Sequence, residues 1–177
     1  MKIFIVSGFL GAGKTTFFKR LARNVAQRVA ILENEYGAAG IDGARLGQNR
    51  QGTQKNVWEM TEQCICCIGK KDFAASVLTI ANVVDPEYLI VEPTGVGSLA
   101  RIIENLRQIE YERIQLLSPV TIVDVYSYRR YMAEYPELYQ DQIRSADTII
   151  VSKTEACQAE EKQRIQKFLQ EINSQAK

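Results

Sequence analysis

The chain has 177 residues, 46% of them hydrophobic and 24% charged, a composition typical of one soluble globular domain with a real core. Lys and Arg number 22 against 21 Asp and Glu, and the resulting net charge of +1 gives no general field that attracts nucleic acid or an anionic membrane. No apolar run approaches the roughly 20 residues that span a bilayer. We therefore expect a cytoplasmic protein with no nucleic-acid partner and no membrane partner.

Five short apolar runs, rich in β-branched residues, predict the strands of a central sheet. They are continuously apolar rather than alternating, which is typical of parallel strands covered on both faces. Between most of them, apolar residues recur at helical spacing. The strand runs are 3–6, 29–32, 88–91, 120–123 and 148–151, and the helical patterns are 17–25, 73–81, 99–109 and 165–172. This alternation predicts a three-layer α/β fold with a mainly parallel central sheet.

Three further features of the sequence lead to predictions: a polar segment, a helix cap and a group of tyrosines. Residues 36–63 are rich in Gly, Asn and Gln, with one short strand expected at 57–60, and a polar excursion of this length inside a domain is usually functional or mobile. Asp72 is expected to cap the helix that follows it. Five of the eight tyrosines fall between 126 and 139, which predicts a tyrosine-rich helix covering the sheet, with a partner surface as the alternative.

The stretch "GFLGAGKT" (8–15) matches G-x-x-x-x-G-K-[ST] and lies between a predicted strand and a predicted helix. Three glycines let the backbone N–H groups face a phosphate chain at the positive end of the helix. Lys14 supplies a charge for the β- and γ-phosphates, the Thr15 hydroxyl completes a Mg²⁺ shell, and Thr16 donates to the α-phosphate. This pattern and its position predict a P-loop NTPase fold.

A second motif, "SKTE" (152–155), follows the last apolar run. In GTPases the corresponding strand ends in N-K-x-D, whose Asp pairs with guanine. Here Ser152 replaces the Asn and Glu155 replaces the Asp, while Lys153, whose stem can stack over the base, is retained. Asp124, at the end of another strand, is expected to cap a helix, with a role at the nucleotide edge as the alternative.

The stretch "CICC" packs three of the four cysteines into residues 64–67. In a reducing compartment such clusters are more often metal-binding or catalytic than disulfide-bonded, and bridging the adjacent Cys66 and Cys67 is sterically poor. Three thiolates suit Zn²⁺, Cu⁺, Co²⁺ or Ni²⁺. A closed structural zinc site needs four ligands, so either a glutamate (Glu33, Glu35 or Glu62) adds an oxygen or one position stays open. A zinc knuckle that pins the loop is the alternative, and Cys157 is expected to be a spare thiol.

Together these residues resemble the CobW-type members of the metal-handling P-loop GTPases, relatives of the UreG and HypB nickel chaperones. The resemblance rests on "GFLGAGKTT" (8–16), "ENEYGAAGID" (33–42), "CICC" (64–67), "VEPTG" (91–95) and "SKTE" (152–155). It implies GTP hydrolysis with GTP/GDP and Mg²⁺, coupled to handling of a transition metal, with Zn²⁺ expected first and Co²⁺ or Ni²⁺ as alternatives. The implied partners are a guanine nucleotide, a metalloprotein client and a second copy in a nucleotide- or metal-dependent homodimer.

The same resemblance implies roles for individual residues. Lys14, Glu33 and Glu92 are expected to be catalytic. Glu33, in the first switch, also joins the cysteines as a transition-metal ligand, and Glu92, in the second switch, joins Thr15 at Mg²⁺. The transition-metal thiolates are Cys64, Cys66 and Cys67. The residues expected to contact the nucleotide are Gly8, Gly11, Ala12, Gly13, Lys14, Thr15, Thr16, Gly95, Ser152, Lys153 and Glu155.

The sequence also departs from the family pattern. Gln63 stands where the residue before the first cysteine is commonly Gly, and Gly37-Ala38 replaces a Gly-Glu pair, which removes one potential carboxylate ligand. We expect residues 1–177 to form a single P-loop GTPase domain without the C-terminal domain of larger CobW proteins.

Two other functions stay open at the level of sequence. One is a nucleotide-gated metal buffer or sensor with negligible turnover. The other is a P-loop kinase with a structural zinc site, for which Arg45 and Arg50 would belong to an arginine-rich lid, although a kinase has no need of the cysteine cluster.

Overall fold

The computed structural model describes residues 1–24, 28–35, 57–63, 70–93, 95 and 97–177. Its strands are β1 (Lys2–Ser7), β2 (Val29–Glu35), β3 (Val57–Gln63), β4 (Tyr88–Glu92), β5 (Gln115–Leu116), β6 (Val120–Asp124) and β7 (Thr148–Ser152). Its helices are α1 (Lys14–Asn24), α2 (Lys70–Val83), α3 (Leu99–Arg107), α4 (Tyr128–Glu134), α5 (Pro136–Arg144) and α6 (Ala159–Ile172). Each strand predicted from an apolar run is present, and so is the short strand expected at 57–60.

The strands form one sheet in the order β3-β2-β4-β1-β6-β7, with β5 pairing beside the start of β1. Among these described strands every pair is parallel. All carboxyl ends therefore lie at one edge. The chain proceeds from β1 to β2, β3 and β4 on one side and then to β6 and β7 on the other. The end of β1 is thus the switch point at which open α/β sheets bind ligands.

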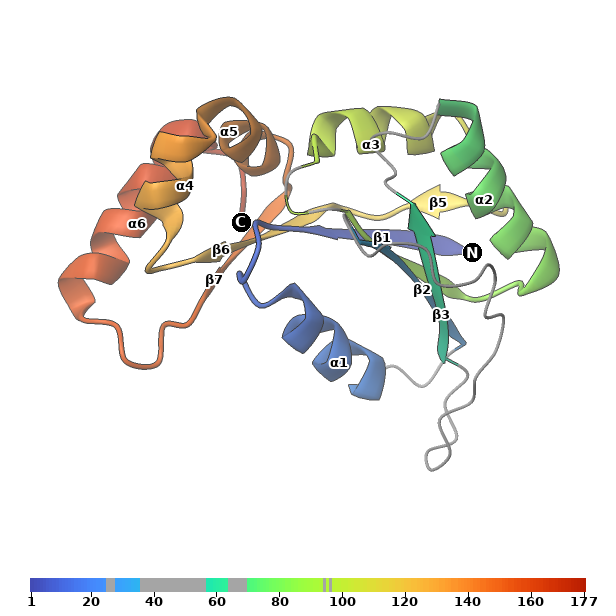
Figure 1. Ribbon diagram of the computed structural model, residues 1–177, viewed down its shortest axis with the longest axis horizontal. Helices are drawn as coiled ribbons and strands as arrows, with labels where there is room; N and C mark the ends of the chain where they lie inside the picture. The colour runs from blue at the N-terminus through green and yellow to red at the C-terminus, as the bar shows by residue number, and fades with distance from the viewer. Residues whose placement is uncertain (25–27, 36–56, 64–69, 94, 96) are drawn as a thin grey trace.

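Helices cover both faces of this sheet, with α2 and α3 on one face and α1 on the other (Figure 1). Alternation along β1 explains the two faces, because Ile3 and Ile5 pack with α2 and α3 while Val6 packs with Phe18 of α1. Helices α4, α5 and α6 pack beside β6 and β7 around a third cluster that contains Val123 (Figure 1). Burial on both faces accounts for the continuous apolar runs and confirms the three-layer α/β fold with its parallel sheet.

The structure corrects some local expectations. The cap expected at Asp72 is wrong, because α2 already begins at Lys70. The tyrosine-rich helix is divided into α4 and α5 at Tyr135, and Pro136 occupies the first turn of α5, where its missing N–H costs nothing. The strand β5 was not predicted, because its two residues do not form an apolar run. Among the described helices, none combines the length and apolar character needed to cross a bilayer.

Candidate functional site

The loop between β1 and α1 is shaped by glycine. Gly8 has φ +144°, and a Cβ there would lie 2.5 Å from the carbonyl oxygen of Ile122, so a side chain has no room at this position. Gly13 has φ +101°, in the region that glycine favours. Within the loop the N–H of Ala12 donates to Phe9 O at 3.1 Å, and α1 begins at Lys14 directly afterwards. The turn therefore delivers the chain into a helix N-terminus at the switch point, as phosphate binding requires.

Lys14 points back into this loop. Its side chain is buried, and Nζ donates to Gly8 O at 2.8 Å and to Phe9 O at 3.3 Å. The carboxylate of Glu92 lies 3.8 Å from the same nitrogen. Burial lowers the pKa of Lys14, while the negative charge of Glu92 acts in the opposite direction. The loop thus holds one desolvated ammonium group, and the exposed Thr15 and Thr16 follow it in the first turn of α1.

The acidic residues of the two predicted switches meet at the carboxyl edge of the sheet. Glu92 ends β4, and the backbone of Glu33 pairs with it in register on one side and with Thr61 of β3 on the other. β3 runs parallel to β2 and ends at Gln63, which pairs with Glu35. Cys64 is the next residue in the sequence. The cysteine cluster at 64–67 itself lies outside the described residues, and its role as a metal site stays a prediction.

The predicted base motif directly contacts the loop of residues 8–13 between β1 and α1, which is called the phosphate loop below. The hydroxyl of Ser152 donates to Ala12 O at 2.7 Å and lies 3.4 Å from Val123 O. Lys153 follows with φ +59°, and its ammonium group lies 2.7 Å from the carboxylate of Asp124. Glu155 is exposed in the turn after β7. The structure thus brings Ser152 and Lys153 to the phosphate loop, while a contact between Glu155 and a base stays a prediction.

The cap expected at Asp124 is wrong, because Ser127 is the N-cap residue of α4 and Asp124 accepts from no N–H of that helix, although it binds the residues just before it. Its carboxylate accepts from the Tyr126 N–H at 2.9 Å and from the Ser127 hydroxyl at 2.6 Å, where Ser127 is the N-cap residue of α4. Burial by itself raises the pKa of Asp124, but the hydrogen bonds from Lys153, Ser127 and Tyr126, together with the Lys153 charge, outweigh it and leave this pKa below its ordinary value. Asp124 therefore fixes both the start of α4 and the position of Lys153.

The tyrosine-rich segment also reaches the phosphate loop. The Tyr131 hydroxyl donates to Leu10 O at 2.8 Å, and the ring centroid of Phe9 lies 4.7 Å from that of Tyr131 and 4.9 Å from that of Tyr139. An open cleft of about 460 Å³ lies between this segment and the loop, and its lining includes Leu10, Tyr126 and Lys153. The density of tyrosine between 126 and 139 was the sequence signal for this contact, although it did not indicate the loop as the partner.

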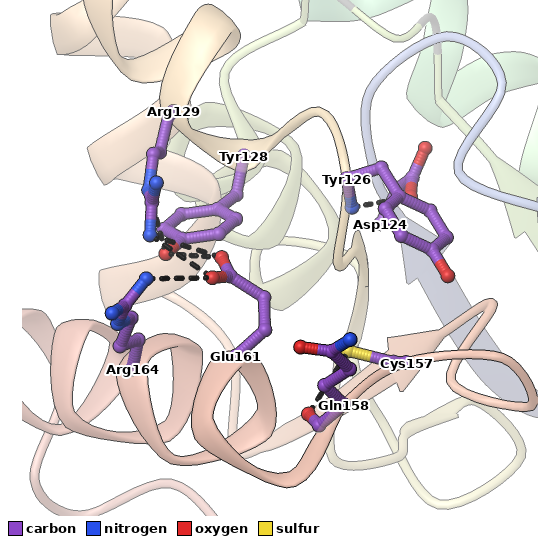
Figure 2. A network of polar contacts seen from close by, with 8 residues as sticks. All are labelled: Asp124, Tyr126, Tyr128, Arg129, Cys157, Gln158, Glu161 and Arg164. Carbon is purple, nitrogen blue, oxygen red and sulfur yellow. Dashed lines mark hydrogen bonds and ion pairs between the residues drawn. The ribbon is translucent and has the colours of Figure 1, made fainter.

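Helix α6 secures the far side of this segment. Glu161 accepts from the Tyr128 hydroxyl at 3.1 Å, from Arg129 at 3.0 Å and from Arg164 at 3.4 Å (Figure 2). The thiol of Cys157, expected to be a spare thiol, makes a weak contact with Gln158 O at 3.6 Å and packs against the cluster formed by α4, α5 and α6. This network joins α4 to α6 and so keeps α4 beside the phosphate loop.

The parallel sheet, the glycine-shaped loop after β1 and the buried lysine together define a P-loop NTPase fold. The chain belongs to the CobW/HypB/UreG family, whose nucleotide-binding domain matches residues 2–177. Among curated relatives, it is 30% identical over 170 residues to the "Zinc chaperone YeiR" of Escherichia coli, covering 94% of this chain and 51% of that protein. It is 28% identical over 189 residues to the "Zinc chaperone CobW" of Pseudomonas aeruginosa, covering 90% of this chain and 50% of the relative.

Solved structures share the fold. Zn(II)-bound YjiA GTPase from E. coli superposes with a TM-score of 0.73 at 23% identity, over 100% of this chain and 56% of that one. HypB from Helicobacter pylori in complex with nickel gives a TM-score of 0.58 at 15% identity, over 98% of this chain and 75% of that one. The chain spans about half the length of the curated relatives it matches.

Proposed function

We propose that this chain binds GTP and GDP with Mg²⁺ at the loop between β1 and α1, hydrolyses GTP, and couples the nucleotide state to a transition metal held by the cysteine cluster at 64–67. The observation that carries the proposal is the register of β2, in which Glu33 pairs with Glu92 on one side and with Thr61 on the other. The phosphate loop, a switch carboxylate and the strand that leads into the cysteines thereby share one edge of the sheet.

The residues of the loop fit a phosphate chain. A Cβ at Gly11 or Gly13 would meet nothing within 4 Å, so the loop borders open space at both glycines. Lys14 exchanges its bonds to two loop carbonyls for bonds to phosphate oxygens, which are stronger because both partners are charged. The Thr15 hydroxyl and the Glu92 carboxylate are the oxygen donors that Mg²⁺ prefers. The ion, when bound, supplies positive charge to the phosphate oxygens.

In the proposed hydrolysis, the protein positions groups and stabilises charge. Lys14 stabilises the negative charge that develops between the β- and γ-phosphates. Glu33, two residues before the end of β2, accepts a hydrogen bond from the attacking water and orients it. Ser152 and Lys153 hold the ribose and base side of the loop, and Glu155 accepts the guanine N–H groups.

The proposed cargo is zinc, as in the relatives named zinc chaperones. The three thiolates occupy three of the four positions around zinc, and the fourth is filled by Glu33 or stays open to a ligand from a client. An incomplete shell suits a metal that is passed on. The acceptor would be a metalloprotein in the cytoplasm, where adjacent thiols stay reduced. A homodimer that forms on nucleotide or metal binding is part of the same proposal.

Single-turnover hydrolysis of GTP, with excess protein and with or without zinc, tests this function. We expect all of the limiting GTP to be converted to GDP, at a rate that changes when zinc binds. Lys14→Ala should abolish the reaction, and Cys66→Ser with Cys67→Ser should retain hydrolysis but lose its response to zinc. Binding of GTP without hydrolysis would instead support a nucleotide-gated metal buffer or sensor, and transfer of the γ-phosphate to an acceptor other than water would support the kinase.

A further inference from the structure

A buried glutamine of α5 holds the segment that joins β4 to α3. Gln142 is only 1% exposed, and its Nε2 donates to Gly95 O at 3.1 Å and to Gly97 O at 3.0 Å. Because both partners are carbonyl oxygens, which only accept, the nitrogen of the Gln142 side-chain amide must face them. The two contacts therefore fix the orientation of this amide. The backbone of the segment is thereby bound from α5 at two points that are two residues apart.

The residue before Gln142 acts on the other end of the same segment. Asp141 Oδ2 accepts from the Leu99 N–H at 2.7 Å and from the Ala100 N–H at 3.4 Å, which are orphan donors of the first turn of α3. Ser98 caps a third donor, because its hydroxyl accepts from the Arg101 N–H. Consecutive side chains of α5 thus fix both the loop and the start of the helix that follows.

The opposite side of Gly95 lies against the phosphate loop. A Cβ at Gly95 would be 2.9 Å from the backbone nitrogen of Leu10 and 3.3 Å from the carbonyl carbon of Phe9. Gly95 therefore lies between the phosphate loop and the Gln142 amide, with no room for a side chain.

Helix α5 is itself anchored on both sides of this contact. The carbonyl of Gln142 accepts from the Thr121 hydroxyl of β6 at 2.7 Å, and the Tyr139 ring packs edge-on against Phe9 of the phosphate loop. α5 is therefore fixed to the sheet and to the loop, and it can hold Gly95 at a set distance from the phosphate site.

We propose that Gln142 is a positioning residue, which holds the backbone at Gly95 and Gly97 so that Gly95 is in place to receive the γ-phosphate of a nucleotide bound at the adjacent loop. The inference rests on the proposed function, since it takes the ligand to be a nucleoside triphosphate. GDP lacks the group that would reach Gly95. Because the backbone is already ordered, it loses less conformational entropy when the γ-phosphate binds. Gln142 therefore contributes to the preference for triphosphate over diphosphate.

The test compares Gln142→Met, which keeps the length of the side chain and removes both donors, with Gln140→Met. The control makes the same chemical change two residues away on α5, where Gln140 contacts Met132 and Arg144 instead. Gln142→Asn, whose amide is drawn back by one methylene group, is the milder variant if Gln142→Met does not fold. We expect Gln142→Met to lower the affinity for a non-hydrolysable GTP analogue about 10-fold, with GDP affinity unchanged, as loss of two buried hydrogen bonds would do.

Hydrogen–deuterium exchange of the backbone amides at 95–100, measured without nucleotide, separates this inference from the proposed function. Faster exchange in Gln142→Met, but not in Gln140→Met, supports the contact. A wild type that binds neither nucleotide would refute the proposed function and the γ-phosphate role with it. Unchanged exchange would overturn the inference. Faster exchange with an unchanged ratio of GTP-analogue to GDP affinity would overturn the positioning role and leave a purely structural contact.

Discussion

The hydroxyl of Ser152, at the end of β7, donates a hydrogen bond of 2.7 Å to the backbone carbonyl of Ala12 in the phosphate loop. These residues are 140 positions apart in the chain. The bond joins the strand that carries the predicted base motif to the loop that carries the predicted phosphate site. Serine at this position therefore keeps a direct link between the two halves of the site, although the guanine motif of GTPases has Asn here.

Replacing Ser152 with Ala should loosen this link. Loss of this partly buried hydrogen bond is expected to lower the free energy of unfolding by about 0.5–1.5 kcal/mol and to weaken nucleotide binding, because the carbonyl of Ala12 is no longer held. Urea denaturation and nucleotide titration measure the two effects. Thr79→Ala removes a similar hydroxyl-to-carbonyl bond of 2.8 Å on the exposed side of α2 and should leave nucleotide affinity unchanged. Equal affinity in Ser152→Ala and the wild type would show that the link has no part in binding.

Replacing Lys14 with Ala should abolish binding of Mg²⁺–GTP and leave the fold intact. The buried ammonium group binds two loop carbonyls in the structure, and a charge-assisted bond to phosphate is worth roughly 1.5–3 kcal/mol. Removing a desolvated charge does not by itself destabilise the core. Calorimetry measures the affinity, and Lys162→Ala, on the exposed surface of α6, is the control. An affinity for Mg²⁺–GTP that is the same in Lys14→Ala as in the wild type would contradict the assignment of the phosphate site.

The carboxylate of Asp124 should make stability depend on pH. Because its folded-state pKa lies below the ordinary value, it contributes stability that is present above about pH 3.9 and is lost as the pH falls through the folded-state pKa. Asp124→Asn cannot ionise and lacks this contribution at every pH. Unfolding free energies of the two proteins should therefore differ at pH 7 and converge below pH 4. A difference independent of pH would show that the pair with Lys153 does not contribute in this way.

Glu155 is expected to select guanine with reduced affinity. Its carboxylate can accept two N–H bonds from guanine, for which adenine has no matching donor pair, but it is one methylene group longer than the Asp of the usual motif. Glu155→Asp should bind GTP more tightly, and Glu155→Gln should bind it more weakly because one acceptor becomes a donor. Displacement of a labelled guanine nucleotide measures both variants. If ATP displaces the label from the wild type as well as GTP does, guanine is not the preferred base.

Patterns within short segments predicted most of the fold. A strand such as 3–6 is apolar at every position because Ile3 and Ile5 face one layer of helices and Val6 the other. The phosphate loop was predictable for a similar reason, since its glycines and Lys14 are adjacent in the chain. By contrast, α5 carries Asp141 and Gln142 in a polar sequence, and their partners at 95–100 lie more than 40 positions away. The same holds for Ser152 and Ala12, whose proximity depends on the parallel order of β1, β6 and β7.

The central claim is that nucleotide and metal are coupled through the edge of the sheet where β2, β3 and β4 end. Zinc affinity measured by competition with a chromophoric chelator, first with GDP and then with a non-hydrolysable GTP analogue, tests it most directly. The account predicts that zinc affinity differs by roughly 5–150-fold between the two nucleotide states. By linkage, bound zinc must change the relative affinity for the GTP analogue and GDP by the same factor. The difference should disappear in Cys66→Ser with Cys67→Ser. Equal zinc affinities in the two nucleotide states would contradict the account and reduce the cysteine cluster to a structural site.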